Sequence, residues 1–278
     1  MNPVRLVNRS RTIRSQGESV SKNATIEHLR ADGLCVVRGN NEVLKGISFT
    51  VAAGEVYGLL GGNGVGKSTT LLTFLGFLEP AMGTVAVKSM PVQEDLERAR
   101  AAIAYLPESA SLYEHLNARE NLEYFLKLAG TAPKLEKIDA ALDQVALKGA
   151  AREQKLSGYS KGMRQKVSIA LAILRDTDIL LLDAPTSGLD PIAIDEFHDL
   201  VRGLADSGKS ILMVTHDVYG ACQVADRIGL LRDGELVGEF SSPENGRIDT
   251  EEVHQAFSGR SGSSGASGVS GTNGRDAA

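Results

Sequence analysis

The chain has 278 residues, of which 42% are hydrophobic and 5% aromatic, so it is long and apolar enough to bury a sizeable core. Its 30 basic and 35 acidic side chains give a net charge of −5, which argues against nucleic-acid binding through bulk positive charge and leaves any polyanion site local. The two cysteines, Cys35 and Cys222, have no paired spacing, and reduced thiols are a simpler interpretation than a disulfide framework or a cysteine zinc site.

The two ends of the chain are predicted to be disordered tails. Residues 1–23 carry five basic side chains and one acidic side chain, with no apolar stretch long enough for a secretory signal. A solvated tail is favoured there over a transit peptide or a contact with anionic lipid. Residues 258–278 are mostly Ser and Gly, which offer too little apolar surface to offset the entropy of ordering. No run reaches the ~18 apolar residues of a membrane-spanning helix, so we expect another chain to cross any membrane involved.

Residues 24–257 alternate short β-rich runs with longer amphipathic runs, which predicts an α/β domain. Glu55–Leu60 favours a strand, and it leads through Gly61-Gly-Asn-Gly-Val-Gly-Lys-Ser68 into the helical pattern of Thr69–Phe77. Strand, glycine loop and helix form the context of a phosphate-binding loop, in which backbone N–H groups and a helix N-terminus face an anion. A glycine-rich turn with a solvated lysine is the alternative, and the strand–helix context disfavours it.

Within this loop, Lys67 is expected to reach the β- and γ-phosphates of a nucleotide, and Ser68 to place its hydroxyl on Mg²⁺. The nucleotide-binding residues expected here are Gly61, Asn63, Gly64, Gly66, Lys67, Ser68 and Thr69. Further along, residues of about 109–158 are rich in helix formers with apolar periodicity, as in Asn117–Leu128 and Leu135–Leu147.

A second element of a phosphate site is a buried strand that ends in an acidic residue, and Asp178-Ile-Leu-Leu-Leu-Asp183 is such a run. A continuous apolar strand is typical of a parallel sheet covered on both faces, and ligands bind beyond the carboxyl ends of such strands. Asp183 is expected to hold Mg²⁺ through water; that it only begins a turn is the alternative. His216 follows the strand-like run Ser210–Thr215, so we expect it at the same sheet edge.

These motifs, together with three others, resemble the nucleotide-binding domain of ATP-binding cassette (ABC) proteins over residues of about 26–257. The others are Tyr159-Ser-Lys-Gly-Met163 followed by Arg164-Gln-Lys166, Ser187-Gly-Leu-Asp190, and the position of His216. The Tyr-Ser-Lys-Gly-Met form, with Tyr105-Leu-Pro-Glu108 upstream, is most similar to the subgroup that pairs with separate ABC-2-type permeases in bacterial exporters. The resemblance implies a P-loop NTPase α/β fold with a mostly parallel core sheet, an antiparallel β subdomain, and an α-helical subdomain over about 109–176 that meets the permease.

The signature motif can be framed in two ways, because Leu156-Ser-Gly158 also looks like the start of the family's Leu-Ser-Gly-Gly-Gln. The frame at Tyr159 is preferred, since it lets Ser160 cap a helix that runs to about Leu174. The resemblance implies that Ser160 and Gly162 face the γ-phosphate held by a second copy of the chain. A simple capped surface helix is the alternative.

Asp190 and His216 each have an ordinary structural role as an alternative to the functional role that the resemblance implies. Asp190 is a good N-cap with Pro191 at the first helical position, and the resemblance adds a role at the seam of a dimer. His216 resembles the switch histidine that contacts the γ-phosphate, although a lone histidine is usually structural. No role is assigned to the remaining histidines, which lack metal-ligand spacing: His28, His115, His198 and His254.

The chain departs from the family pattern at three positions. Ala184 stands where the family has the glutamate that polarises the attacking water, so ATP binding should survive while hydrolysis is impaired. The complete set of other motifs favours an engineered substitution, and a naturally degenerate site also fits. Arg38 stands at the position of the aromatic residue that stacks on adenine, and an arginine plane can still stack on a base. Glu108 replaces a glutamine and could approach Mg²⁺ or the attacking water, or be an exposed carboxylate only.

The sequence therefore predicts an ATPase subunit of an ABC exporter that binds ATP and Mg²⁺. One phosphate loop and one signature in each chain imply that two copies clamp two nucleotides. We expect a multispan permease as partner, a position on the cytoplasmic face of the membrane, and no nucleic acid. The alternatives are a soluble ATP-gated module that acts on a protein or nucleic acid, and a regulatory nucleotide sensor in which Ala184 is natural.

Overall fold

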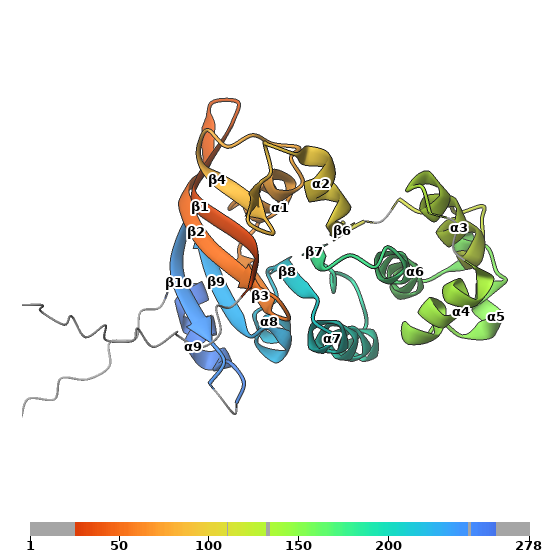
Figure 1. The fold of residues 1–278 in the computed structure, drawn as a ribbon. Helices are drawn as coiled ribbons and strands as arrows, with labels where there is room; N and C mark the ends of the chain where they lie inside the picture. The colour runs from red at the N-terminus through yellow and green to blue at the C-terminus, as the bar shows by residue number, and fades with distance from the viewer. Residues whose placement is uncertain (1–25, 110, 132–133, 244–245, 260–278) are drawn as a thin grey trace, which may run out of the picture.

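The computed structural model describes residues 26–109, 111–131, 134–243 and 246–259. The tails predicted at 1–23 and 258–278 lie outside these residues, except for Ser258 and Gly259. In Figure 1 the two β-sheets and the helices that pack on them form one part of the molecule, at the left, and a helical lobe forms the other part, at the right.

The first sheet is antiparallel and four-stranded, in the order β2-β1-β4-β5. Its strands are β1 (Glu27–Arg38), β2 (Asn41–Ala52), β4 (Met82–Val87) and β5 (Met90–Pro91). Leu29 pairs with Val51 on one side and with Val87 on the other, and all three side chains are buried. The apolar side of this sheet packs against a hydrophobic core that it shares with the second sheet and α1.

The second sheet is six-stranded and mostly parallel, in the order β10-β9-β3-β8-β7-β6. Its strands are β3 (Val56–Gly61), β6 (Ile103–Leu106), β7 (Ile179–Asp183), β8 (Ser210–Thr215), β9 (Arg227–Arg232) and β10 (Glu235–Ser241), of which only β10 pairs antiparallel. The register pairs Leu60 with Thr215 and Asp183 with Val214. The carboxyl ends of β3, β7 and β8 therefore meet at one edge, where the sequence predicts Asp183 and His216.

Ten helical segments connect or cover the sheets in the described residues. They are α1 (Lys67–Phe74), α2 (Leu96–Ala101), α3 (Ala118–Leu128), α4 (Leu135–Gln144), α5 (Gly149–Arg152), the 3₁₀ segment η1 (Leu156–Gly158), α6 (Lys161–Leu174), α7 (Pro191–Asp206), α8 (Val218–Val224) and α9 (Thr250–Ser258). α3, α4 and α5 form the lobe with α6 beside them (Figure 1). Among the described residues, we find no helix that combines the length and the apolarity needed to span a bilayer.

The two faces of the parallel sheet contribute to two separate hydrophobic cores, because strand side chains alternate. Leu180 and Leu182 belong to the core shared with the helices around α6 and α7, whereas Ile179 and Leu181 belong to the core beneath the antiparallel sheet and α1. In that second core Phe49 stacks on Tyr57 with ring centroids 5.0 Å apart. Burial on both faces explains why β7 and β8 read as continuous apolar runs.

The predicted fold class is confirmed, and the differences lie at helix ends. α1 begins at Lys67 and ends at Phe74, short of the predicted Phe77, and Gly76 then takes a left-handed φ of 65°. α4 ends before Leu147 because Ala146 has a φ of 50°, which a helix cannot continue. α3 begins as expected, since Asn117 and Glu120 form a capping box.

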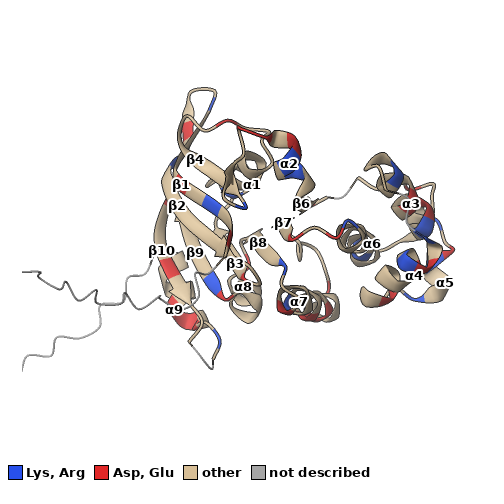
Figure 2. Ribbon diagram, viewed as in Figure 1, with Lys and Arg blue, Asp and Glu red and all other residues tan. Residues whose placement is uncertain are grey.

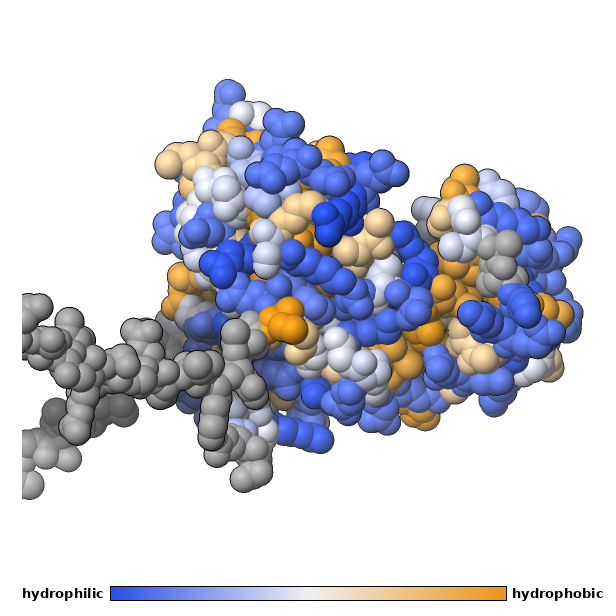
Figure 3. Space-filling model, in the orientation of Figure 1, coloured by the Kyte–Doolittle hydropathy of each residue, from blue (hydrophilic) through white to orange (hydrophobic). Residues whose placement is uncertain are grey.

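The surface agrees with the balanced composition. Acidic and basic residues occur on the same elements in Figure 2, notably in the helical lobe. Figure 3 shows a mostly hydrophilic face interrupted by smaller apolar patches. Any strongly attractive site for an anion must therefore be built by a few local groups.

Candidate functional site

The loop between β3 and α1 takes a tight course that depends on glycine. Gly64 and Gly66 have φ of 78° and 113°, in the left-handed region. A Cβ on Gly66 would lie 2.5 Å from Leu44 Cδ2 and 3.1 Å from the carbonyl oxygen of Val43, so β2 packs directly against the loop. The loop thus runs directly into the N-terminus of α1. An anion site requires such a course, because the backbone N–H groups of the loop and of the helix N-terminus can then face one anion.

Lys67 is the first residue of α1, and its ammonium group lies over the loop. Nζ donates to the carbonyl oxygens of Gly61 and Gly62 at 2.9 and 2.6 Å. Burial lowers the pKa of Lys67, and the nearby carboxylate of Asp183 partly opposes that shift. An anion would stabilise this partly buried cation, so Lys67 is suited to the phosphates of a nucleotide.

Asp183 ends β7 opposite Lys67, and two hydroxyl groups orient its carboxylate. Ser68 Oγ donates to Oδ1 at 3.1 Å, and Tyr105 Oη donates to Oδ2 at 3.5 Å. Burial raises the pKa of Asp183, the Ser68 hydrogen bond opposes the rise, and the negative charge of Glu108 adds to it. Burial and the adjacent Asp183 also raise the pKa of Tyr105 to about 12, so the phenol stays protonated.

The residues around Asp183 fit a magnesium ion. The hydroxyl of Ser68 and the carboxylates of Asp183 and Glu108 are the hard oxygen donors that Mg²⁺ prefers, and Mg²⁺ usually takes few protein ligands and completes its shell with water and phosphate. The raised pKa of Asp183 points the same way, because a nearby cation would relieve its desolvation and its repulsion from Glu108. Within the described residues no cluster of three or more His, Cys, Asp or Glu side chains could hold a metal alone.

Replacing Asp183 by Asn is expected to stabilise the ligand-free protein. A carboxyl group whose pKa is raised in the folded state loses stability as the pH increases through that pKa, so at neutral pH its charge opposes folding. Asn keeps an acceptor for Ser68 Oγ. We expect the melting temperature at pH 7 to increase by about 2 °C, measured by circular dichroism without nucleotide or Mg²⁺.

Asp178, which directly precedes the same strand, offers a matched control. Its pKa is lowered, first by its hydrogen bond from Lys88, so its charge favours folding at neutral pH. Asp178→Asn should decrease the melting temperature. A decrease for Asp183→Asn as well would contradict the assignment of Asp183 as a destabilising charge.

One cavity of about 560 Å³ lies over the loop, and we call it the loop cavity. It is lined by Arg38, Val43, Asn63, Gly64, Gly66, Lys67, Ser68, Thr69, Glu108, Asp183, Ala184 and His216. The fold thus gathers candidate residues from β1, the loop, the end of β6, β7 and the end of β8. Val43 is the lining residue that the sequence did not single out, because its position depends on the pairing of β2 with β1.

Four candidate residues lie outside the loop cavity. Gly61 is buried at the end of β3, where a Cβ would lie 2.5 Å from the carbonyl oxygen of Leu231; its carbonyl oxygen accepts from Lys67. Ser160, Gly162 and Asp190 belong to the segments that begin α6 and α7. A single copy of the chain therefore does not bring the signature motif to its own loop cavity.

Ala184 follows Asp183 and has a φ of 42°. Residues other than glycine rarely adopt this left-handed backbone conformation. Its N–H donates to the carbonyl oxygen of Val214 at 2.9 Å, which fixes it beside β8. Glu108 lies close by, where its Oε1 accepts from Ser187 Oγ at 3.2 Å. The methyl group of Ala184 cannot take a proton, and Glu108 is the remaining carboxylate beside Asp183 in the cavity.

The two candidate frames of the signature motif begin at residues with different surroundings. Leu156 is fully buried in η1, whereas Ser160 caps α6, with its Oγ accepting from the N–H of Met163 at 3.2 Å. Tyr159 Oη donates to the carbonyl oxygen of Ala151 at 2.6 Å, which anchors the turn. Asp190 caps α7 in the same way, accepting from the N–H of Ala193 at 3.0 Å.

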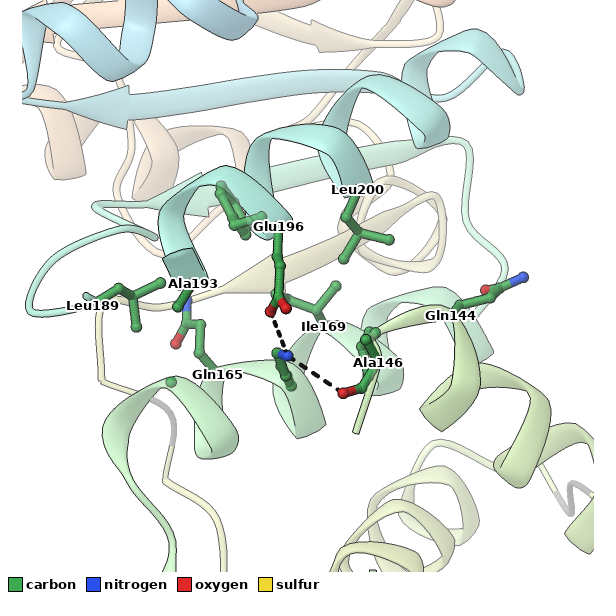
Figure 4. A pocket seen from close by; sticks show the side chains of 12 residues that line it. Gln144, Ala146, Gln165, Ile169, Leu189, Ala193, Glu196 and Leu200 are labelled. Atoms are coloured by element: carbon green, nitrogen blue, oxygen red, sulfur yellow. Dashed lines mark hydrogen bonds and ion pairs between the residues drawn. The ribbon is translucent and has the colours of Figure 1, made fainter. Parts of the chain in front are cut away.

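Two contacts tie α6 to α7 and to the loop after Ala184. Lys166 Nζ pairs with Glu196 Oε2 at 2.6 Å, at the edge of a small pocket between the helices (Figure 4). Gln165 Nε2 donates to the carbonyl oxygen of Pro185 at 3.1 Å. In the sequence Gln165 and Lys166 stand out only as part of the family pattern, because their partners lie 20 and 30 residues away.

Comparison with known proteins places this chain in a family. The profile of the ABC transporter family matches residues 44–187. Nod factor export ATP-binding protein I of Burkholderia lata is 38% identical over 205 residues, covering 72% of this chain and 66% of that protein. Daunorubicin/doxorubicin resistance ATP-binding protein DrrA of Streptomyces peucetius is 36% identical over 218 residues, covering 78% and 66%. These alignments thus span about two thirds of the length of the relatives.

Solved structures agree. An ATP-binding subunit of an ABC transporter superposes with a TM-score of 0.69 at 27% identity, covering 84% of this chain and 95% of that one. A dimeric bacterial ABC transporter cassette gives a TM-score of 0.69 at 25% identity, covering 77% and 98%. On the matched profile, the relatives and the fold, the chain belongs to the ABC transporter family of ATP-binding proteins.

Proposed function

We propose that the chain is the ATP-binding and ATP-hydrolysing subunit of an ABC-2-type exporter, which energises a separate membrane permease from the cytoplasmic face. The observation that carries the proposal is the joint lining of the loop cavity by Lys67, Ser68, Asp183 and His216. This set supplies a cation, two oxygen donors for a metal and a further polar group at one helix N-terminus. That combination matches the chemistry of a magnesium nucleoside triphosphate.

Each residue has a part in this mechanism. The loop N–H groups orient the phosphate chain, and Lys67 neutralises its charge. Ser68 and Asp183 would hold Mg²⁺, with Glu108 beside them, and the ion when bound neutralises phosphate charge. His216 would contact the terminal phosphate, and Arg38 would lie against the base.

The proposed catalytic unit contains two copies of the chain. Ser160, Gly162 and Asp190 lie outside the loop cavity of their own copy. The N-terminus of α6, where Ser160 caps the N–H of Met163, favours an anion. A second copy, arranged head to tail, would bring its Ser160 turn to the phosphate held by Lys67 of the first. A solved cassette of similar fold is dimeric, which supports a dimer of this chain.

The permease would meet the helical lobe. An aromatic cluster lies on that lobe, in which Tyr113 and Tyr124 pack edge to face at 4.9 Å and are 41% and 43% exposed. Leu128 on the same α3 is 73% exposed. Two of the relatives are a Nod factor export protein and a drug resistance protein, which supports an export partner.

The dimer can be tested by light scattering after size exclusion. We expect the full chain to be a monomer with Mg-ADP and a dimer with Mg-ATP, because Ala184 slows the hydrolysis that would reopen it. Ser160→Arg should bind Mg-ATP and remain a monomer. Ser207→Arg, at the end of α7 that lies farthest along the helix from Asp190, should dimerise normally. A chain that stays monomeric at saturating Mg-ATP contradicts the proposal.

The permease can be tested by purifying the chain from detergent-solubilised membranes of its own cells. A multispan membrane protein that co-purifies in stoichiometric amounts supports the exporter. A soluble partner or a nucleic acid in its place would support the ATP-gated module instead.

A further inference from the structure

His198 lies on α7 with a polar atom that has no partner. The side chain is 9% exposed, and its Nε2 is buried without a hydrogen bond among the described residues. Buried polar atoms in native proteins are nearly always bonded, so an exception of this kind requires an explanation. Nothing in the sequence pattern around His198 assigns it a role.

Asp217 carries a second polar atom beside the space that His198 Nε2 borders. A Cβ added to Gly220 would lie 3.2 Å from His198 Nε2 and would collide with Asp217 Oδ2, so both polar atoms border the space that this glycine leaves. Asp217 Oδ1 caps α8 by accepting from the N–H of Gly220 at 3.0 Å, while Oδ2 accepts from no described residue. A nitrogen and a free carboxylate oxygen therefore border the same narrow gap beside Gly220, and no hydrogen bond joins them.

This gap lies between two segments of the proposed site. α7, which carries His198, begins at the Asp190 loop. Asp217 directly follows His216, which lines the loop cavity, and its N–H donates to Thr215 Oγ1 at 3.0 Å. A shift of the His216 segment toward a bound phosphate would move Asp217 together with it.

We propose that His198 is a positioning residue, whose Nε2–H donates to Asp217 Oδ2 when nucleotide is bound and so holds the His216 segment against α7. The proposal rests on the proposed function, in which His216 contacts the terminal phosphate. His198 touches no nucleotide itself. It acts through Asp217, and it links the helix that begins at Asp190 to the segment that ends β8.

The electrostatic surroundings are consistent with this pairing. Burial lowers the pKa of His198, and the negative charge of Asp217 opposes that shift more strongly than the charges of Asp195 and Asp199 on α7 itself. β3 and β8, which also contact α7, carry no charged residue. Of the three carboxylates that act on the pKa of His198, Asp217 is the one that does not belong to α7.

The bond can be tested by the concentration of Mg-ATP at which half of the chain is dimeric. His198→Met fills the same volume without a donor, and it should raise this concentration about three- to tenfold, the effect of one hydrogen bond. His198→Gln, which places an amide donor near the position of Nε2, should stay within about twofold of the unmodified chain. Asp217→Asn, which keeps an acceptor for the cap, should resemble His198→Met, and the double variant should be no worse than either.

Histidine ¹⁵N NMR of the full chain supplies a second measurement that does not require dimerisation. We expect the Nε2–H signal of His198 to shift on addition of Mg-ATP, and Asp217→Asn to abolish that shift. Equal effects of Met and Gln at position 198, additive effects of the His198 and Asp217 variants, or an unchanged NMR signal would overturn the proposal. If the chain binds Mg-ATP without dimerising, the proposed function fails, and the NMR measurement still decides whether the bond forms.

Discussion

Replacing Ala184 by Glu is expected to raise the rate of ATP hydrolysis by about 10²–10⁴-fold, the usual contribution of a positioned general base. Ala184 lines the loop cavity next to Asp183, and its backbone is fixed by the hydrogen bond to Val214. A glutamate there would carry its carboxylate toward the water that attacks the terminal phosphate. Binding of ATP should change little, because Lys67, Ser68 and Asp183 are untouched.

The measurement is phosphate release under saturating Mg-ATP, with Ala184→Gln as the matched control. Gln has the size of Glu and cannot take a proton, so it should remain slow. An Ala184→Glu enzyme as slow as the Gln variant would show that Ala184 does not stand at the position of the base. That outcome would favour the regulatory nucleotide sensor, in which Ala184 is natural.

Lys67→Met is expected to weaken the binding of Mg-ATP by about 10²-fold, since a hydrogen bond to a charged group contributes up to about 3 kcal/mol. Among the residues that line the loop cavity, only Lys67 and Arg38 carry a fixed positive charge. Lys67 follows the loop that we propose binds the phosphates, whereas Arg38 ends β1. Calorimetric titration of the full chain measures the effect.

Lys127→Met is the control for the loss of one positive charge. Lys127 lies on the surface of α3, where it pairs with Glu123, and its removal should leave the affinity unchanged. Lys67→Met also removes the hydrogen bonds from Nζ to the carbonyl oxygens of Gly61 and Gly62, so its affinity is measured well below its melting temperature. Unchanged affinity in the Lys67 variant would contradict the assignment of the loop cavity as the nucleotide site.

Much of the fold could be predicted because the relevant signals are local. β7 and β8 are buried on both faces, so each reads as a continuous apolar run. The starts of α6 and α7 could be predicted from Ser160 and Asp190, since N-caps act within a single turn. Because the carboxyl ends of parallel strands meet at one edge of the sheet, Asp183 and His216 could then be predicted to lie beside the phosphate loop.

The remaining features depend on contacts between distant parts of the chain. Val43 reaches the loop cavity through strand pairing, and Gln165 binds a partner 20 residues away. His198 Nε2 lacks a hydrogen-bond partner beside Gly220, a residue of α8 that has no side chain to fill the space. No pattern of neighbouring residues encodes such a contact, because it is created only when the helices pack.

The attachment of α6 to α7 by the Lys166–Glu196 pair, and to the Ala184 loop by Gln165, has a consequence for the timing of the two halves of a dimer. In the proposed dimer, these two contacts would link the turn that each copy offers to its neighbour with the strand end that serves its own nucleotide. We therefore expect the state of one ATP to influence the binding of the other, so that dimerisation depends on ATP concentration with a Hill coefficient above one.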